Sequence, residues 1–430
     1  MFKNLKQLFS KKNKDLRKRI YFTLLVLTIY VIGISIEVPG TQQITKNLGF
    51  LELLNVMGGG ALKNFSIFAL GVSPYITASI IIQLLQMDII PYFSELGKQG
   101  ATGQQKLNQI TRYVGILFAF VQGYAMSIAF LGSSVGTLGY LKVSLIMTAG
   151  TAFLLWLGDQ VTQKGLGNGV SLLIMAGIVY SLPSMMKTAF NSLISNGLAY
   201  ATALEIGSFV LFLLVYLLII VGVVWMEGAE RRISIQYANK STANLGKQTF
   251  MPIKINSAGV IPVIFASSLL GIPATIAQFI NKGDFTNFVD KYLNYNQPVG
   301  FILFVVLIFF FAYFYTFVQM KPDNMAKNLQ NNGGYIPGIR PGEATKKYFT
   351  SVLARLTVVG AFALTLLAVL PILVNMFTPL PSSVQLGGTG LLIVVGVAIE
   401  TYKQLEGSLL SREYSNSTSS RRGRTRRISR

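Results

Sequence analysis

The sequence predicts an all-α membrane protein with ten transmembrane helices in two inverted halves. Three observations lead to this fold class: the composition, the segregation of charge along the chain, and an internal repeat. Of the 430 residues, 52% are hydrophobic and only 12% are charged, and the mean hydropathy is +0.53. A soluble chain of this length would need a much larger charged surface, so membrane protein is the first conclusion.

Apolar runs without any Asp, Glu, Lys or Arg divide the chain into ten segments. Most are long enough to cross a hydrocarbon core of about 30 Å. A charge at the centre of the bilayer would cost about 2.5–3.5 kcal/mol, which explains why charges are excluded from them. The predicted spans are Ile20–Ile36, Pro74–Met87, Tyr113–Leu131, Val143–Leu157, Gly169–Leu182, Ile206–Met226, Ile255–Ile280, Phe301–Val318, Leu356–Val374 and Gly388–Ile399. The second, fifth and tenth are short, so they need tilt or extension by polar flanks.

The distribution of Lys and Arg predicts the orientation. When residues 1–19 are placed in the cytoplasm, 31 of the 37 Lys and Arg residues fall in cytoplasmic connections. This excess follows the positive-inside rule, so we expect a multi-pass protein of the cell membrane with both termini cytoplasmic. The same bias is the main explanation of the net charge of +21, although ribosomal RNA or acidic lipid could also use that charge.

Two pairs of similar peptides indicate an internal repeat. GVSPYITAS at 71–79 matches GVIPVIFAS at 259–267 in six of nine positions, and LLIMAGIV at 172–179 resembles LLIVVGVA at 391–398. Segments one to five thus correspond to segments six to ten, and five crossings per half give the halves opposite orientations. Chance similarity of apolar sequence is the alternative, and the proline shared by the first pair argues against it.

These features predict the domain organisation. We expect an N-terminal half at 1–200, a C-terminal half at 201–410 and a basic, disordered tail at 411–430. The tail could bind ribosomal RNA or anionic lipid, or only add solubility. Residues 53–71 contain three consecutive glycines and an apolar stretch too short to span, which favours a re-entrant segment in an outer vestibule over a surface loop.

Missing residue types exclude several function classes. The chain has no Cys and no His, which removes thiol catalysis and His-dependent hydrolase or metal sites. The charge-free segments argue against ion-coupled transport and intramembrane aspartyl proteolysis. GLGNGVS at 165–171 is only a fragment of a phosphate-binding pattern, and no strand precedes it. We therefore expect a passive conduit that is not an enzyme and has no cofactor and no metal. A small-molecule transporter with inverted repeats and an intramembrane hydrolase are the alternatives.

Five longer stretches resemble a known family. They are GGGALKNFSIFALGVSPYITASIIIQLL (58–85), KGLGNGVSLLIMAGI (164–178), PIKINSAGVIPVIFASS (252–268), YIPGIRPGEAT (335–345) and GGTGLLIVV (387–395). Together they are similar to SecY, the channel-forming subunit of the bacterial Sec protein translocon. The resemblance implies two pseudo-symmetric five-helix halves around a central pore, a re-entrant plug helix, and a lateral gate between segments 2–3 and 7–8.

The resemblance also implies a function and its partners. The channel would pass unfolded secretory polypeptides across the membrane and release membrane helices sideways through the gate. The implied partners are the SecE and SecG subunits, the SecA ATPase, the ribosome, signal-bearing preproteins and membrane lipid.

Site residues follow from the resemblance position by position. The implied pore ring is Val72, Ile76, Ile174, Ile264 and Ile393. The implied plug covers about 59–70 and includes Gly59, Gly60, Ala61, Leu62, Lys63, Asn64, Phe65, Ser66, Ile67 and Phe68. The implied polar residues of the lateral gate are Thr77, Gln122 and Asn256. A ring of apolar side chains can exclude water when it is empty, and ordinary helix packing is the alternative reading of its members.

Two cytoplasmic loops are the implied docking sites for SecA and the ribosome. Arg231 and Arg232 lie in the loop at 227–254, and Arg340 lies in the loop at 319–355. Plain orientation charge is the alternative for each arginine. Prolines and glycines on both sides of Arg340 favour a shaped turn, which makes a functional role more plausible there.

Overall fold

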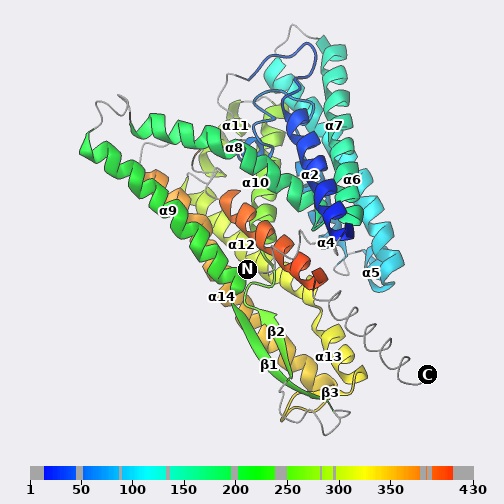
Figure 1. The fold of residues 1–430 in the computed structure, drawn as a ribbon. Coiled ribbons are helices and arrows are strands. Elements are labelled where there is room, and N and C mark those ends of the chain that lie inside the picture. The colour runs from blue at the N-terminus through cyan, green and yellow to red at the C-terminus, as the bar shows by residue number, and fades with distance from the viewer. Residues whose placement is uncertain are drawn as a thin grey trace, which may run out of the picture.

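The computed structural model describes residues 14–44, 52–86, 90–131, 136–194, 202–237, 249–280, 283–293, 297–377, 384 and 390–409. The helices are α2 Lys14–Ile34, α3 Glu52–Met57, α4 Ser73–Leu85, α5 Pro91–Lys98, α6 Ala101–Leu131, α7 Gly136–Lys164, α8 Gly169–Leu193, α9 Ala203–Gly228, α10 Ile261–Ile280, α11 Gly283–Tyr292, α12 Pro298–Met320, α13 Pro322–Asn331 and α14 Glu343–Phe377 (Figure 1). Residues 390–409 are also helical. The predicted tail at 411–430 lies outside the described residues.

Each of the ten predicted spans overlaps one helix. Helices α6, α7, α8 and α9, the stretch from α12 into α13, and α14 are long and apolar enough to cross a membrane. Helix α4 and the first part of α10 are shorter apolar helices. Several helices run past the apolar segments into polar flanks, because the apolar run sets the membrane-crossing part and not the end of the helix.

Local sequence signals explain several helix starts. The Asn168 side chain caps α8 by accepting hydrogen bonds from the Val170 N–H at 3.1 Å and the Ser171 N–H at 3.4 Å. Thr202 and Glu205 form a capping box at the start of α9. Helices α4, α5 and α12 have proline in their first turn. A backbone N–H at this position has no acceptor within the helix, so its absence in proline costs no helical hydrogen bond.

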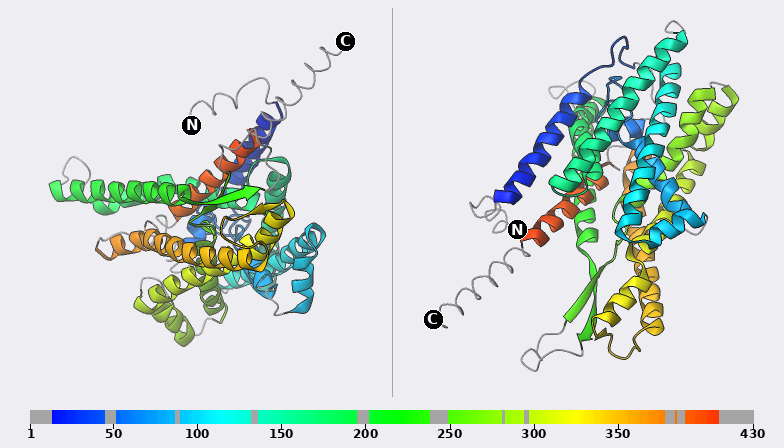
Figure 2. Two further views of the ribbon diagram at one scale, coloured as in Figure 1. Left: turned by 90° about the horizontal axis from the view of Figure 1, so that it is seen from below. Right: turned by 90° about the vertical axis from the view of Figure 1, so that its right-hand side faces the viewer.

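The helices form two groups that meet at α10. Helices α2, α6 and α7 pack together in the N-terminal half, and α9, α12 and α14 pack together in the C-terminal half (Figures 1 and 2). Helix α10 packs against α12 of its own half and also against α4 and α6 of the other half. The seam between the halves therefore runs along α4, α6 and α10.

A small antiparallel sheet adds to the helical fold. Its strand order is β2-β1-β3, with β1 at Glu230–Tyr237, β2 at Thr249–Lys254 and β3 at Gly334–Tyr335. With α13 and the start of α14 it projects from one end of the helical body, and we call this unit the sheet subdomain (Figure 1). Its core is a separate apolar cluster that includes Ile233, Ile253 and Phe349.

The expected plug helix is a chain of turns in the structure. The helical part of this region is α3, and residues 58–72 form successive turns. Gly59, Gly60 and Gly71 have φ values of +72°, +81° and +56°, and Phe65 has a φ of +47°. These conformations are incompatible with a right-handed helix, and the glycines adopt them without steric cost.

Candidate functional site: an apolar ring, a plug and a seam pocket

The five expected ring residues are buried in one continuous apolar cluster. Their exposed fractions lie between 3% and 7%. Val72 and Ile76 lie at the start of α4 and Ile174 lies in α8, whereas Ile264 lies in α10 and Ile393 lies in the helix at 390–409. Both halves thus contribute to the cluster.

The expected plug packs on the N-terminal half through Phe68. Its ring stacks between Tyr30 of α2, at a centroid distance of 6.0 Å, and Phe153 of α7, at 6.2 Å. A Cβ atom at Gly33 of α2 would overlap the Phe68 ring, so the absence of a side chain there makes room for it. Phe68 and Tyr30 also belong to the apolar cluster of the ring residues.

Backbone hydrogen bonds hold the plug to the segment that follows α2. The Val38 N–H donates to the Phe65 carbonyl at 2.9 Å, and the Ile67 N–H donates to the Ile36 carbonyl at 3.0 Å. At the end of the plug, the Thr151 hydroxyl of α7 donates to the Gly71 carbonyl at 3.2 Å. All of these partners belong to the N-terminal half.

A cavity of about 890 Å³ lies between the plug and the second half of α8. It is lined by Glu52, Asn55 and Lys63 on the plug side and by Tyr180 and Ser184 on the α8 side, among others. Burial raises the pKa of the Glu52 carboxyl, and the Asn55 hydrogen bond and the Lys63 charge oppose that shift. The plug thus has a polar face toward this cavity and an apolar face toward the helices.

Two of the three expected gate residues share one pocket at the seam. This seam pocket has a volume of about 270 Å³ and is lined by α4, α6 and α10. Its lining residues are Leu54, Ser73, Pro74, Thr77, Ile81, Phe118, Val121, Gln122, Ser268, Gly271, Ile272 and Ile276. Thr77 and Gln122 are therefore polar positions in a mainly apolar pocket. The sequence reasoning missed Ser268, a buried serine directly after the second repeat peptide, whose hydroxyl has no hydrogen-bond partner within the described residues.

Asn256 lies in a different cavity from Thr77 and Gln122. This second cavity, of about 110 Å³, is lined by Glu227, Asn256, Ile264 and Glu400 among others. The Asn256 side-chain amide donates to Glu227 Oε1 at 2.9 Å and to the Gly259 carbonyl at 3.0 Å. The three expected gate residues are thus divided between two cavities. Asn256 precedes α10, and its side chain hydrogen-bonds to Glu227 in the last turn of α9.

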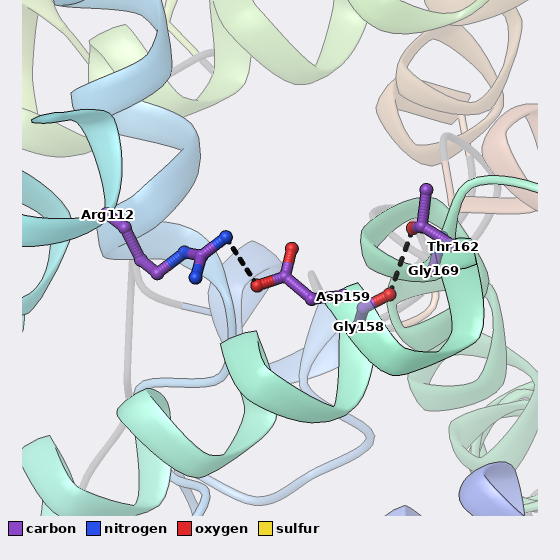
Figure 3. Close-up of polar contacts among 5 residues, drawn as sticks. All are labelled: Arg112, Gly158, Asp159, Thr162 and Gly169. Carbon is purple, nitrogen blue, oxygen red and sulfur yellow. Dashed lines mark hydrogen bonds and ion pairs between the residues drawn. The ribbon is translucent and has the colours of Figure 1, made fainter. Parts of the chain in front are cut away.

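Helix α6 of the seam is joined to α7 by an ion pair. Arg112 Nη2 of α6 lies 2.6 Å from Asp159 Oδ2 of α7, and Figure 3 shows the two side chains pointing toward each other. One turn further along α7, the Thr162 hydroxyl donates to the Gly158 carbonyl and accepts from the Gly169 N–H, both at 2.9 Å (Figure 3). A Cβ at Gly169 would overlap the Gly158 carbonyl, so this glycine permits a tight turn from α7 into α8.

The two expected docking loops meet in the sheet subdomain. Arg231 and Arg232 lie on β1, and both are exposed. Strand β1 pairs with β3, which places the second loop beside the first, through the pairs Gln236 with Tyr335 and Tyr237 with Gly334. Arg232 also forms an ion pair of 2.9 Å with Glu230, at the surface.

Arg340 lies in an ordered turn that leads into α14. Its side chain is exposed, and its carbonyl accepts a hydrogen bond from the Thr345 hydroxyl at 2.9 Å. Gly338 and Gly342 on either side have φ values of +82° and +99°. The expectation of a shaped turn around Arg340 is therefore confirmed.

The fold and the site define a class of protein: a multi-pass membrane protein of channel architecture, whose two helical halves share one buried apolar cluster. The family model for SecY matches residues 66–402. Protein translocase subunit SecY of Staphylococcus epidermidis is 47% identical, over 96% of this chain and 99% of its own length. The protein of that name from Staphylococcus aureus is 48% identical, over 94% and 96%. The chain belongs to the SecY family.

Solved structures show the same fold. A structure described as a protein conducting channel has a TM-score of 0.68 and 20% identity, and the match covers 92% of this chain and 93% of that chain. Sec61 in a canine ribosome-channel complex from the endoplasmic reticulum has a TM-score of 0.64 and 19% identity, with the same coverage. The predicted fold class and family are thereby confirmed.

Proposed function

We propose that this chain is the protein-conducting channel of a Sec translocon. It passes unfolded secretory polypeptides across the membrane and releases membrane helices sideways between the halves. The observation that carries the proposal is the buried cluster of Val72, Ile76, Ile174, Ile264 and Ile393, which draws on both halves and lies beside a docked plug.

The ring residues form the seal of the resting channel. Valine and isoleucine side chains can close around an extended polypeptide and exclude water when the pore is empty. The plug adds a second barrier, and residues 59–70 are held in place by backbone hydrogen bonds at Phe65 and Ile67 and by the packing of Phe68. In this proposal the chain binds no cofactor and catalyses no reaction, and partners supply the energy.

The seam pocket is the place where the lateral gate opens. A signal sequence with about ten leucine-like residues gains roughly 3–6 kcal/mol on entering lipid. Shifting a gate from mostly closed to mostly open requires about 5.5 kcal/mol, so a good signal suffices and a poor one does not. Thr77 and Gln122 set part of this threshold, because they are polar side chains in the pocket and a polar contact between membrane helices is worth up to about 1–2 kcal/mol.

The sheet subdomain is the docking surface for SecA and the ribosome. Its exposed Arg231, Arg232 and Arg340 suit an acidic or RNA partner. This role places the subdomain and both termini in the cytoplasm, in agreement with the excess of Lys and Arg in the same set of connections. SecE and SecG are the proposed companion subunits. We also propose that the halves at 1–200 and 201–410 move relative to each other when the gate opens.

Reconstitution tests the proposal. The chain is placed in liposomes with SecE, SecG and SecA, and a preprotein with a signal sequence is added together with ATP. We expect the preprotein to become protected from external protease, and a preprotein without its signal to stay accessible.

Two outcomes would overturn the proposal. One is the absence of any protected preprotein although the chain is inserted and SecA is active. The other is selective uptake of a small solute by the chain alone, which would favour the transporter alternative.

A further inference from the structure

The short helix α11 lies between two apolar helices and has an apolar stripe that the protein covers only in part. Two residues separate it from α10, and five separate it from α12. Its sequence is GDFTNFVDKY, and its large apolar residues are Phe285, Phe288, Val289 and Tyr292. This spacing of i, i+3, i+4 and i+7 places all four on one face of the helix.

One side of the stripe packs on the C-terminal half. Val289 is 2% exposed and belongs to the large apolar cluster, and Phe285 packs against the same cluster. The Thr286 hydroxyl of α11 donates to the Ala277 carbonyl of α10 at 3.5 Å, so α11 lies beside the last turns of α10. Helix α12 also contacts α11. Helix α11 is therefore fixed to two helices of the C-terminal half.

The other side of the stripe is exposed. Phe288 is 51% exposed and Tyr292 is 39% exposed. Their rings lie in a tilted arrangement with centroids 5.1 Å apart, and the Lys291 ammonium group lies 5.6 Å from the centre of the Tyr292 ring. We call these two rings the aromatic patch. An exposed apolar patch of this kind is a contact site for another molecule.

The aromatic patch lies close to the level of a membrane surface. Helix α10 has 20 residues, which is about 30 Å at a rise of 1.5 Å per residue and matches the thickness of the hydrocarbon core. Its last turns therefore lie where the hydrocarbon meets the lipid headgroups, and the contact of Thr286 with Ala277 brings α11 to this level. Figure 1 shows α11 at the end of the molecule opposite the sheet subdomain.

The residue types of the patch suit the headgroup layer. Tyrosine is enriched at membrane–water interfaces because its ring is apolar at one end and polar at the other, and a nearby lysine can extend its ammonium group into water. Both flanking helices also expose apolar side chains next to α11 in the sequence, since Ile276 of α10 is 45% exposed and Val299 of α12 is 51% exposed. Lipid contact at these positions would continue onto α11.

We infer that α11 is an interfacial anchor whose partner is the phospholipid surface on the side opposite the sheet subdomain. Its inner side packs on α10 and α12, and Phe288 and Tyr292 enter the headgroup layer, as in other amphipathic helices that lie in the membrane interface. Because α11 is tied to α10, the anchor fixes one end of a seam helix at the membrane surface. The inference requires a membrane-spanning chain and does not depend on polypeptide transport.

The accessibility of spin labels to collision tests the anchor. The chain has no cysteine, so Phe288→Cys places a single label in the aromatic patch, and Asn287→Cys places one at an exposed polar residue of the same helix. In liposomes, the ratio of accessibility to oxygen, which concentrates in lipid, over accessibility to a water-soluble nickel chelate should be several-fold higher for Phe288→Cys. Ile302→Cys, at a residue of α12 that is 61% exposed, supplies the value for lipid contact.

Two outcomes of this measurement would overturn the inference. Equal ratios for Phe288→Cys and Asn287→Cys would mean that both residues face water. Low accessibility of the Phe288→Cys label to both reagents would mean that protein, such as a second copy of this chain, covers the patch.

Fluorescence quenching tests the depth of the patch. The chain has two tryptophans, Trp156 and Trp225, so Trp156→Phe and Trp225→Phe give a background in which Phe288→Trp is the only fluorophore of its kind. Tryptophan also favours the interface, so this change keeps the expected contact. Lipids brominated near the headgroup should quench it more strongly than lipids brominated near the ends of their acyl chains. Stronger quenching by the deep bromines, or none by either lipid, would contradict the anchor.

Discussion

Phe68 connects the plug to two helices that are far apart in the sequence. Its ring fills the space left by Gly33 and stacks on Tyr30 and Phe153. Close-packed interiors transmit a change of one methyl group, because few voids exist to absorb it. The docked position of the plug therefore depends on Gly33, because any larger residue there would overlap the Phe68 ring.

We predict that Gly33→Ala raises the resting ion conductance. The added Cβ displaces the Phe68 ring, and the overpacking costs about 1–3 kcal/mol, which shifts the plug toward its undocked state. Conductance of the empty channel in planar bilayers is the measurement. Gly207→Ala is the matched control, because a Cβ at Gly207 of α9 meets no other atom within 4 Å. Equal conductance of the two variants would refute the role of this contact.

The ring assignment also makes a prediction at a single residue. Ile264→Asn should raise the resting ion conductance, because a polar side chain lets water occupy the apolar layer. Ile308→Asn on α12 is the comparison, since Ile308 is fully buried in the same cluster but is not a ring residue. The same increase in both variants would mean that general loss of packing, and not the ring, controls the leak.

At the scale of elements, the elbow from α7 into α8 supports one side of the seam. Gly158, Thr162 and Gly169 fix this elbow, and Arg112 joins α6 to it through Asp159. The two ionic side chains are 41% and 31% exposed, so their attraction is worth up to about 1 kcal/mol. That is enough to bias the position of α6 without holding it rigidly.

We predict that Arg112→Asp raises the transport of a preprotein with a weakened signal by up to about fivefold, because two like charges then separate α6 from α7. The double variant Arg112→Asp with Asp159→Arg restores the opposite charges and should return transport to the parental level. A double variant that behaves like the single one would show that the pair does not position α6.

The strands illustrate what the sequence did and did not reveal at this scale. Ile233, Ile235 and Tyr237 alternate with polar residues, which is a period-two strand signal within RRISIQY. The pairing of β1 with β3 joins residues about one hundred positions apart, and local periodicity carries no information on such a contact.

The whole molecule combines two apolar bodies with a polar subdomain that has its own core. The ten spans and their division into inverted halves were predictable, because charge exclusion and the repeat are properties of the sequence itself. The ring residues were implied only by the resemblance to SecY. The separation of Asn256 from Thr77 and Gln122 was not, since it depends on which partner a buried amide finds after packing. The irregular plug was likewise hidden, because three glycines permit many backbone paths.

The separation of the sheet subdomain from the expected ring leads to a prediction about the whole molecule. Arg340→Glu should impair SecA- or ribosome-driven transport, because it reverses charge on the proposed docking surface. Resting conductance should stay unchanged, since the sheet subdomain and the ring belong to separate apolar clusters. Lys347→Glu, also exposed at the start of α14, is the control. Parental transport by Arg340→Glu would remove the assignment.

The plug contacts described above have a consequence for how the protein is made. Tyr30, Val38, Thr151 and Phe153 all precede residue 201, and so do the hydrogen bonds that join the plug to them. Chains fold from the N-terminus during synthesis, and domains tend to form as units. The plug can therefore pack against the N-terminal half before the ribosome has synthesised the second half. The proposed pore would then be blocked by the plug from the moment the two halves assemble.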